Sequence, residues 1–178
     1  ARRPTRPDPI DEAPLSDQQA EAIAAALNRH DVRYVVMGGL GSQLHGAPLP
    51  RSKDADVVVE RSPENLRRLC AALRELDARL RVGGGPVDGV DVDLAPDLFK
   101  NMVTTTFVTQ QGPLDVMFRP DGTDGYDDVA TNAGIVRLGD EQLPVADLAD
   151  IIRSKEAAGR PEDLAALPVL RRFLRRRP

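Results

Sequence analysis

Two aspartates of this 178-residue chain stand at the start of an apolar run, and a third lies inside another. Asp54 and Asp56 lie two residues apart before the run 57–59, so on a strand both carboxylates leave the same face. Like charges on one face repel each other unless a cation lies between them, and hard oxygen ligands suit Mg²⁺. Asp115, within the run 114–118, would cost on the order of several kcal/mol if unpaired. An arginine partner, a surface position or a metal site shared with Asp54 and Asp56 would each satisfy Asp115.

A glycine pair precedes these aspartates. The β-branched segment 32–37 predicts a buried strand, and a short helical segment follows Gly38 and Gly39. The glycines permit a sharp turn and a close approach to a ligand, and the N-terminus of a helix suits a phosphate. Ser42 lies in the first turns and could donate its hydroxyl. We therefore predict a phosphate site beside a metal site, the minimum needed to transfer a nucleotidyl group. A tight turn without a ligand is the alternative.

The loop that enters the aspartate strand carries two cations and a hydroxyl. Arg51 is a candidate for a bidentate phosphate contact. Ser52 shares the strand face of the two carboxylates, whereas Lys53 points the other way if the strand already runs there. A solvated loop residue is the alternative for Lys53.

These motifs together resemble the nucleotidyltransferase fold superfamily: Gly-Gly, a short helix, Arg-x-Ser-x-Asp-x-Asp, and a later lone aspartate on a strand. Over residues 32–167 the chain is most similar to the AbiEii-type nucleotidyltransferase toxins of type IV toxin–antitoxin pairs. The resemblance implies an α/β fold with a polymerase-β-like mixed sheet flanked by helices and a C-terminal helical segment. It implies that Asp54, Asp56 and Asp115 are the catalytic, metal-binding residues, with two Mg²⁺ ions and a nucleoside triphosphate (NTP) as substrate.

A second motif supports the toxin branch. The chain resembles the helix–turn–helix of that branch, with its Lys…Arg…Asp pattern, at Lys155, Arg160 and Asp163. The implied roles are a contact from Lys155 to the nucleotide phosphates across the cleft, and pairing of Asp163 with Lys155 or Arg160. The alternative is a surface helix with an acid at its start. The toxin branch further implies an RNA acceptor, with the tRNA 3′ end expected, a block of translation, and a cognate antitoxin protein as partner.

Composition limits the other possibilities. The net charge is −4, but arginines gather at both ends of the chain, which fits contacts to a nucleic-acid backbone. Aromatic residues make up only 3% of the chain, which argues against a base-stacking platform. A single cysteine and no long apolar stretch predict a cytoplasmic protein that does not enter a membrane. The end arginines are Arg2, Arg3, Arg6, Arg171, Arg172, Arg175, Arg176 and Arg177.

We expect a flexible arm over 1–14 and one domain over 15–178, with its core at 32–120 and a helical part at 145–175. Within it, the region 121–128 reads as a loop, and Gln111–Pro113 as a hairpin turn. Asp91 and Asp93 form a second Asp-x-Asp, interpreted as the solvated face of an edge strand. Helices are expected at 16–29, 62–76, 146–158 and 160–174, and strands at 80–82, 104–109, 114–118, 135–138 and 142–145.

Two rival functions remain open. An aminoglycoside-type nucleotidyltransferase has similar Gly-Gly and Asp-x-Asp motifs and would need an acidic pocket for a cationic drug. A non-catalytic relative would bind only a nucleotide or a partner protein.

Overall fold

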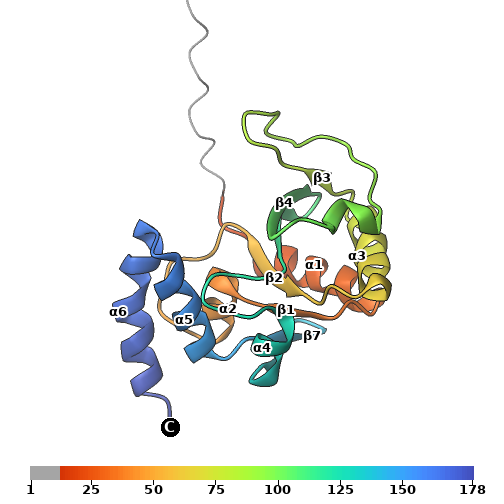
Figure 1. Ribbon diagram of the computed structural model, residues 1–178. Coiled ribbons are helices and arrows are strands. Elements are labelled where there is room, and N and C mark those ends of the chain that lie inside the picture. Colours follow the sequence, from red (N-terminus) through yellow and green to blue (C-terminus); the bar gives the residue numbers. More distant parts are fainter. Residues whose placement is uncertain (1–12) are drawn as a thin grey trace, which may run out of the picture.

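A computed structural model describes residues 13–178, which are built around a seven-stranded mixed sheet (Figure 1). The strands lie in the order β3-β4-β5-β2-β1-β7-β6, with β2 parallel to β5 and β1 parallel to β7. The predicted mixed sheet is confirmed. The strands are β1 (Tyr34–Val36), β2 (Ala55–Val59), β3 (Arg79–Leu80), β4 (Thr104–Thr109), β5 (Gly112–Met117), β6 (Gly134–Leu138) and β7 (Glu141–Val145).

Helices flank this sheet, and α5 and α6 lie side by side at one end (Figure 1). Ser16 and Gln19 form a capping box at the start of α1, and Ser62 caps α3. The helix α5 ends at Gly159, as the sequence predicted. The helices are α1 (Asp17–Arg29), α2 (Gly38–Leu44), α3 (Pro63–Glu75), α4 (Tyr126–Thr131), α5 (Leu148–Ala158) and α6 (Pro161–Arg175), with a 3₁₀ turn at Pro96–Phe99.

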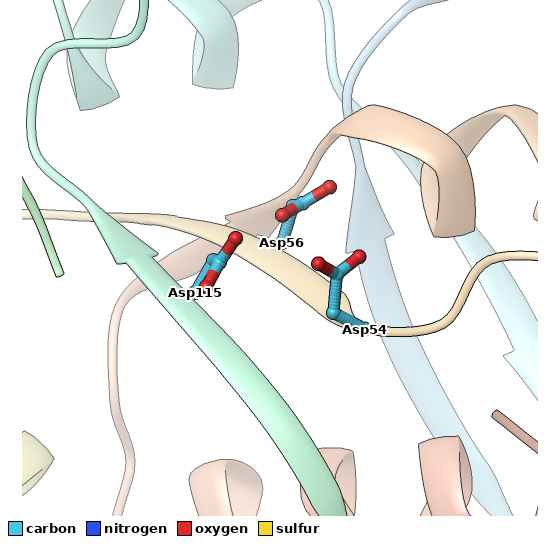
Figure 2. A group of neighbouring side chains, drawn as sticks. All are labelled: Asp54, Asp56 and Asp115. Carbon is cyan, nitrogen blue, oxygen red and sulfur yellow. The ribbon is translucent and has the colours of Figure 1, made fainter. Parts of the chain in front are cut away.

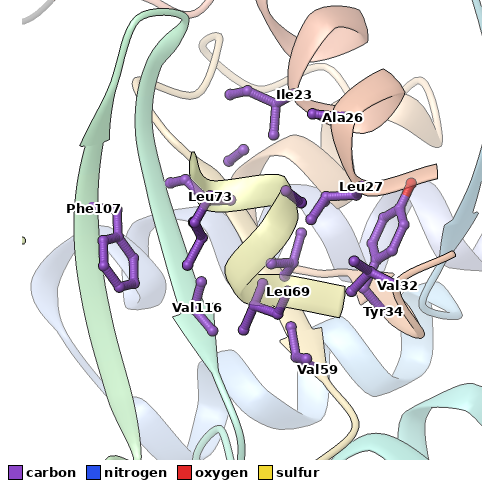
Figure 3. Packing of buried hydrophobic residues seen from close by; sticks show 14 of the residues in the cluster. Ile23, Ala26, Leu27, Val32, Tyr34, Val59, Leu69, Leu73, Phe107 and Val116 are labelled. Atoms are coloured by element: carbon purple, nitrogen blue, oxygen red, sulfur yellow. The ribbon is translucent and has the colours of Figure 1, made fainter. Parts of the chain in front are cut away.

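The central strands have two different faces. Val57 and Val59 of β2 and Val116 of β5 join the main apolar core, where they pack with α1 and α3 (Figure 3). Because side chains alternate along a strand, Asp56 and Asp115 must leave the opposite face. The smaller core on that face contains residues of α4 and α5. The fold therefore places both aspartates on the side of the sheet that α5 covers.

Three local predictions need correction. The region expected to be a loop over 121–128 contains the start of α4, whose Val129 is buried against the second core. The hairpin turn lies one position earlier than predicted, because Gly112 already pairs with Thr109 as the first residue of β5. The strand expected at 80–82 is the shorter β3, Arg79–Leu80, which pairs with Phe107 and Val108 of β4.

Other features lie where expected or outside the described part of the chain. Asp91 and Asp93 are exposed as expected, but they lie outside any strand and follow an isolated bridge between Leu80 and Val90. Cys70 is buried in the main core. Residues 1–12, with their three arginines, lie outside the described residues. No helix within 13–178 is long and apolar enough to cross a membrane.

Candidate active site

The three aspartates predicted to bind metal meet at one point (Figure 2). Asp56 on β2 stands directly beside Asp115 on the parallel strand β5, and Asp54 lies just before β2. One carboxylate oxygen of each residue lies within 4.8 Å of the others. All three residues are half-buried. Three carboxylates converging in this way offer the oxygen ligands that Mg²⁺ prefers, so the donor set fits such an ion.

Asp56 is under electrostatic strain from its surroundings. Burial, followed by the charges of Asp54 and Asp115, raises the pKa of Asp56 well above its ordinary value of 3.8. Lys155 acts in the opposite direction but does not offset these effects. A divalent cation among the carboxylates would remove the repulsion that holds this pKa high.

Hydroxyl groups form hydrogen bonds to the two outer carboxylates of the triad, those of Asp54 and Asp115. Ser52 donates to the side-chain Oδ1 of Asp54 at 3.1 Å and to its backbone oxygen at 2.8 Å. Thr106 on β4 donates to Oδ1 of Asp115 at 2.5 Å. Thr106 was missed at the sequence level, although it faces Asp115 directly across the β4–β5 hairpin.

The glycine turn lies against the central carboxylate. Gly38 has a φ of +60°, in the left-handed region, and a Cβ at this position would lie 1.9 Å from Oδ2 of Asp56. A Cβ on Gly39 would lie 2.9 Å from Oγ of Ser52. Only glycine at position 38 satisfies both the backbone conformation and the close approach.

Two of the predicted phosphate contacts have other partners. The hydroxyl of Ser42 is buried and donates to the backbone oxygen of Gly38 at 3.0 Å, within α2 itself. Arg51 donates to the backbone oxygen of Leu15 and to Oδ1 of Asp17, at the start of α1. In this geometry Ser42 and Arg51 stabilise the scaffold around the site. Lys53 is exposed on the loop before β2.

The second predicted group forms a buried ion cluster between α5 and α6. The side chain of Asp163 is 1% exposed and accepts hydrogen bonds from Nζ of Lys155 at 3.0 Å and from Nε of Arg160 at 2.7 Å. Burial alone would raise the pKa of Asp163, but the hydrogen bonds from Arg160 and Lys155 outweigh it and lower this pKa. The sequence predicted one of these pairs, and the structure shows both.

Removing Asp163 would leave Lys155, whose side chain is 14% exposed, without its partner. We expect Asp163→Ala to lower the free energy of unfolding by about 3 kcal/mol, because an uncompensated buried charge is costly. Asp124→Ala is the matched control, because the Asp124 side chain forms an exposed 3.4 Å pair with Arg119 and no other hydrogen bond or ion pair within residues 13–178. Its loss should change stability by about 0.5 kcal/mol or less. Urea unfolding followed by circular dichroism measures both, and equal losses would contradict this account.

A cavity of about 210 Å³ joins the carboxylates to this ion cluster. Its polar lining includes Asp56 and Asp115 on the sheet and Lys155, Arg160 and Asp163 on the helices. Carboxylates thus line the side of the cavity formed by the sheet, and the cations Lys155 and Arg160 line the opposite wall, formed by the helices. Further lining residues that the sequence did not single out are Val103, Thr104, Met117, Arg119, Pro120, Asp121, Ile151 and Ser154.

Known structures identify the fold, although no family model and no curated protein sequence matches the chain. The lincosamide antibiotic adenylyltransferase LnuA, solved with lincomycin bound, superposes with a TM-score of 0.61 at 12% identity, covering 89% of this chain and 98% of LnuA. The antibiotic-resistance factor ANT(2″)-Ia superposes with a TM-score of 0.57 at 14% identity, covering 89% and 83%. The chain has the nucleotidyltransferase fold.

A candidate nucleotidyltransferase from Thermotoga maritima shares the nucleotidyltransferase fold as well, with a TM-score of 0.54 at 18% identity over 90% of this chain and 92% of that one. Identities this low establish the fold and leave the reaction to be argued from the site itself.

Proposed function

We propose that this protein is a metal-dependent nucleotidyltransferase that moves a nucleoside monophosphate from an NTP to a hydroxyl acceptor. The observation that carries the proposal is the convergence of Asp54, Asp56 and Asp115. Asp56 and Asp115 line a cavity whose opposite wall carries Lys155 and Arg160. The carboxylates provide ligands for Mg²⁺, and the cations face the place where phosphate charge would lie. The shared fold of LnuA and ANT(2″)-Ia supports the same class of reaction.

The chemistry follows from the charges. The acceptor oxygen forms a bond to the α-phosphorus, the bond from that phosphorus to the bridging oxygen breaks, and pyrophosphate leaves. Bound divalent ions would neutralise the charge that gathers in this transition state. Asp115 is placed to receive the proton of the acceptor hydroxyl or to hold a second ion. Lys155 and Arg160, fixed by Asp163, would contact the triphosphate from the helical wall.

RNA is the acceptor we propose, with a tRNA 3′ end as the expected substrate. The helix α6 starts at the cavity, where Arg160 and Asp163 lie, and its other end carries a run of arginines. The 15 residues of α6 span roughly 22 Å. An acceptor that contacts both ends of this helix would therefore be longer than a small molecule. The exposed cations at that end are Arg171, Arg172, Arg175, Arg176 and Arg177.

Transfer to a tRNA end would block translation, which would make the protein a toxin controlled by an antitoxin. This step rests on the similarity of the Gly-Gly, Asp-x-Asp and Lys…Arg…Asp motifs to the AbiEii-type toxins.

A small-molecule acceptor is the second candidate. By name, LnuA is a lincosamide antibiotic adenylyltransferase and ANT(2″)-Ia an antibiotic-resistance factor. Exposed acids line this cavity or a neighbouring one that shares Val103 and Arg119 with it, and a cationic drug would need such charges. Those acids are Asp121, Asp124 and Asp127.

Labelled substrates separate these functions. We expect incubation with total tRNA and each α-³²P-labelled NTP to label RNA, and Asp54→Ala to abolish the signal. Replacing Arg172, Arg175 and Arg176 by glutamine should weaken RNA labelling and flatten its dependence on salt, because fewer counterions are released. Label on an aminoglycoside or a lincosamide, with none on RNA, would overturn the RNA acceptor. No transfer to either, with no NTP binding, would overturn nucleotidyl transfer itself.

A further inference from the structure

The hydrogen bond from Thr106 to Asp115 follows from the register of the β4–β5 hairpin. Thr106 pairs directly with Asp115 across the two antiparallel strands, and both side chains leave the face that carries the site. Side chains at directly opposite positions have Cβ atoms about 5 Å apart, close enough for a hydroxyl to reach a carboxylate without distortion. The 2.5 Å contact is therefore built into the sheet.

This contact determines which oxygen of Asp115 can face an ion. An aspartate carboxylate can rotate about its terminal bond. A side chain that rotates freely loses conformational entropy when it binds an ion, and this loss weakens binding. Because Thr106 holds Oδ1, the other oxygen of Asp115 stays available to an ion. Ser52 holds Asp54 in the same manner from the other side. The two outer carboxylates of the triad are thus each fixed by one hydroxyl.

We propose that Thr106 is a positioning residue for metal binding, which orients the Asp115 carboxylate before the ion arrives. The proposal rests on the metal site of the proposed function, but it concerns affinity for the ion and not the identity of the acceptor. It predicts that loss of the hydroxyl weakens metal binding even when the hairpin keeps its fold.

The surroundings of Thr106 allow a clean substitution. Valine has nearly the shape of threonine and suits a strand equally well, so Thr106→Val removes the hydroxyl and little else. Thr105, its neighbour on β4, pairs with the buried Val116 on the core face of the hairpin. Thr105→Val is therefore the same chemical change on the same strand, away from the site.

Mn²⁺ titration followed by electron paramagnetic resonance tests the proposal on the purified full chain. We expect Thr106→Val to weaken Mn²⁺ binding by about 10- to 100-fold, Thr106→Ser to restore it, and Thr105→Val to leave it unchanged. When the concentration of a labelled NTP is varied, kcat should fall in Thr106→Val while KM for the NTP stays nearly constant.

The outcomes separate this inference from the proposed function. Wild-type Mn²⁺ affinity in a folded Thr106→Val variant would overturn the positioning role. Absence of Mn²⁺ binding in the wild-type protein would overturn the metal site of the proposed function. If Thr106→Val does not fold, Thr106→Ala against Thr106→Ser gives the same comparison, and equal affinity in that pair would overturn the role of the hydroxyl.

Discussion

Asp56→Asn should reduce nucleotidyl transfer by about 10³-fold or more and make the metal-free protein more stable at neutral pH. The loss arises because a neutral amide is a poor substitute for the central carboxylate ligand, and transition-state charge then goes uncompensated. The gain arises because desolvation, together with the charges of Asp54 and Asp115, raises the pKa of the half-buried Asp56 well above 3.8. An activity of more than about a tenth of wild type would contradict the role of Asp56.

The sign of the pH effect follows from this shift. Between 3.8 and its raised pKa, Asp56 binds a proton in the folded protein and releases it in the unfolded chain. The stability of the metal-free wild type should therefore fall as pH rises through that window, relative to Asp56→Asn. Thermal melts in EDTA from pH 4 to pH 8 measure the difference, and Mg²⁺ should raise the Tm of the wild type alone. Parallel melting curves for the two proteins would show that Asp56 carries no such strain.

Gly38→Ala is expected to damage stability and activity together, and Gly84→Ala provides its control. Both glycines have positive φ, +60° and +75°, which costs an alanine roughly 1–2 kcal/mol. Nothing lies within 4 Å of a Cβ at Gly84, whereas a Cβ at Gly38 would overlap Oδ2 of Asp56. Gly38→Ala must therefore displace the carboxylate as well.

We expect a loss of about 3 kcal/mol and of 10²-fold or more in kcat/KM for Gly38→Ala, against about 1 kcal/mol and unchanged activity for Gly84→Ala. Urea unfolding and the labelled-NTP assay measure the two effects. Similar values for the two variants would mean that backbone conformation alone matters at Gly38.

The sequence predicted those parts of the site that depend on local pattern. The spacing of Asp54 and Asp56 places both beside the same cleft, and Asp163 between two nearby cations predicts an ion pair. Contacts between distant segments were harder to predict. The partner of Arg51 lies on α1, 34 residues away in the chain, and no local pattern indicates that pairing.

Small errors in turn position had larger consequences. A hairpin turn centred on Gly112 would move Thr106 away from Asp115, whereas in the structure the two residues are directly paired. The helix α4 was missed because it has only six residues and no side-chain cap, so that packing of Val129 into the second core, and not local propensity, stabilises it. Where tertiary packing decides the structure, a single sequence carries a weak signal.

The order in which the two halves of the cavity appear along the chain has a consequence for synthesis. The strands with the three aspartates leave the ribosome before α5 and α6, whose Lys155 and Arg160 form the opposite wall. A nascent chain that stops short of α5 would already hold the ion-binding acids but none of that wall's cations. The two sides of the cavity would thus come together only after α5 and α6 have been synthesised.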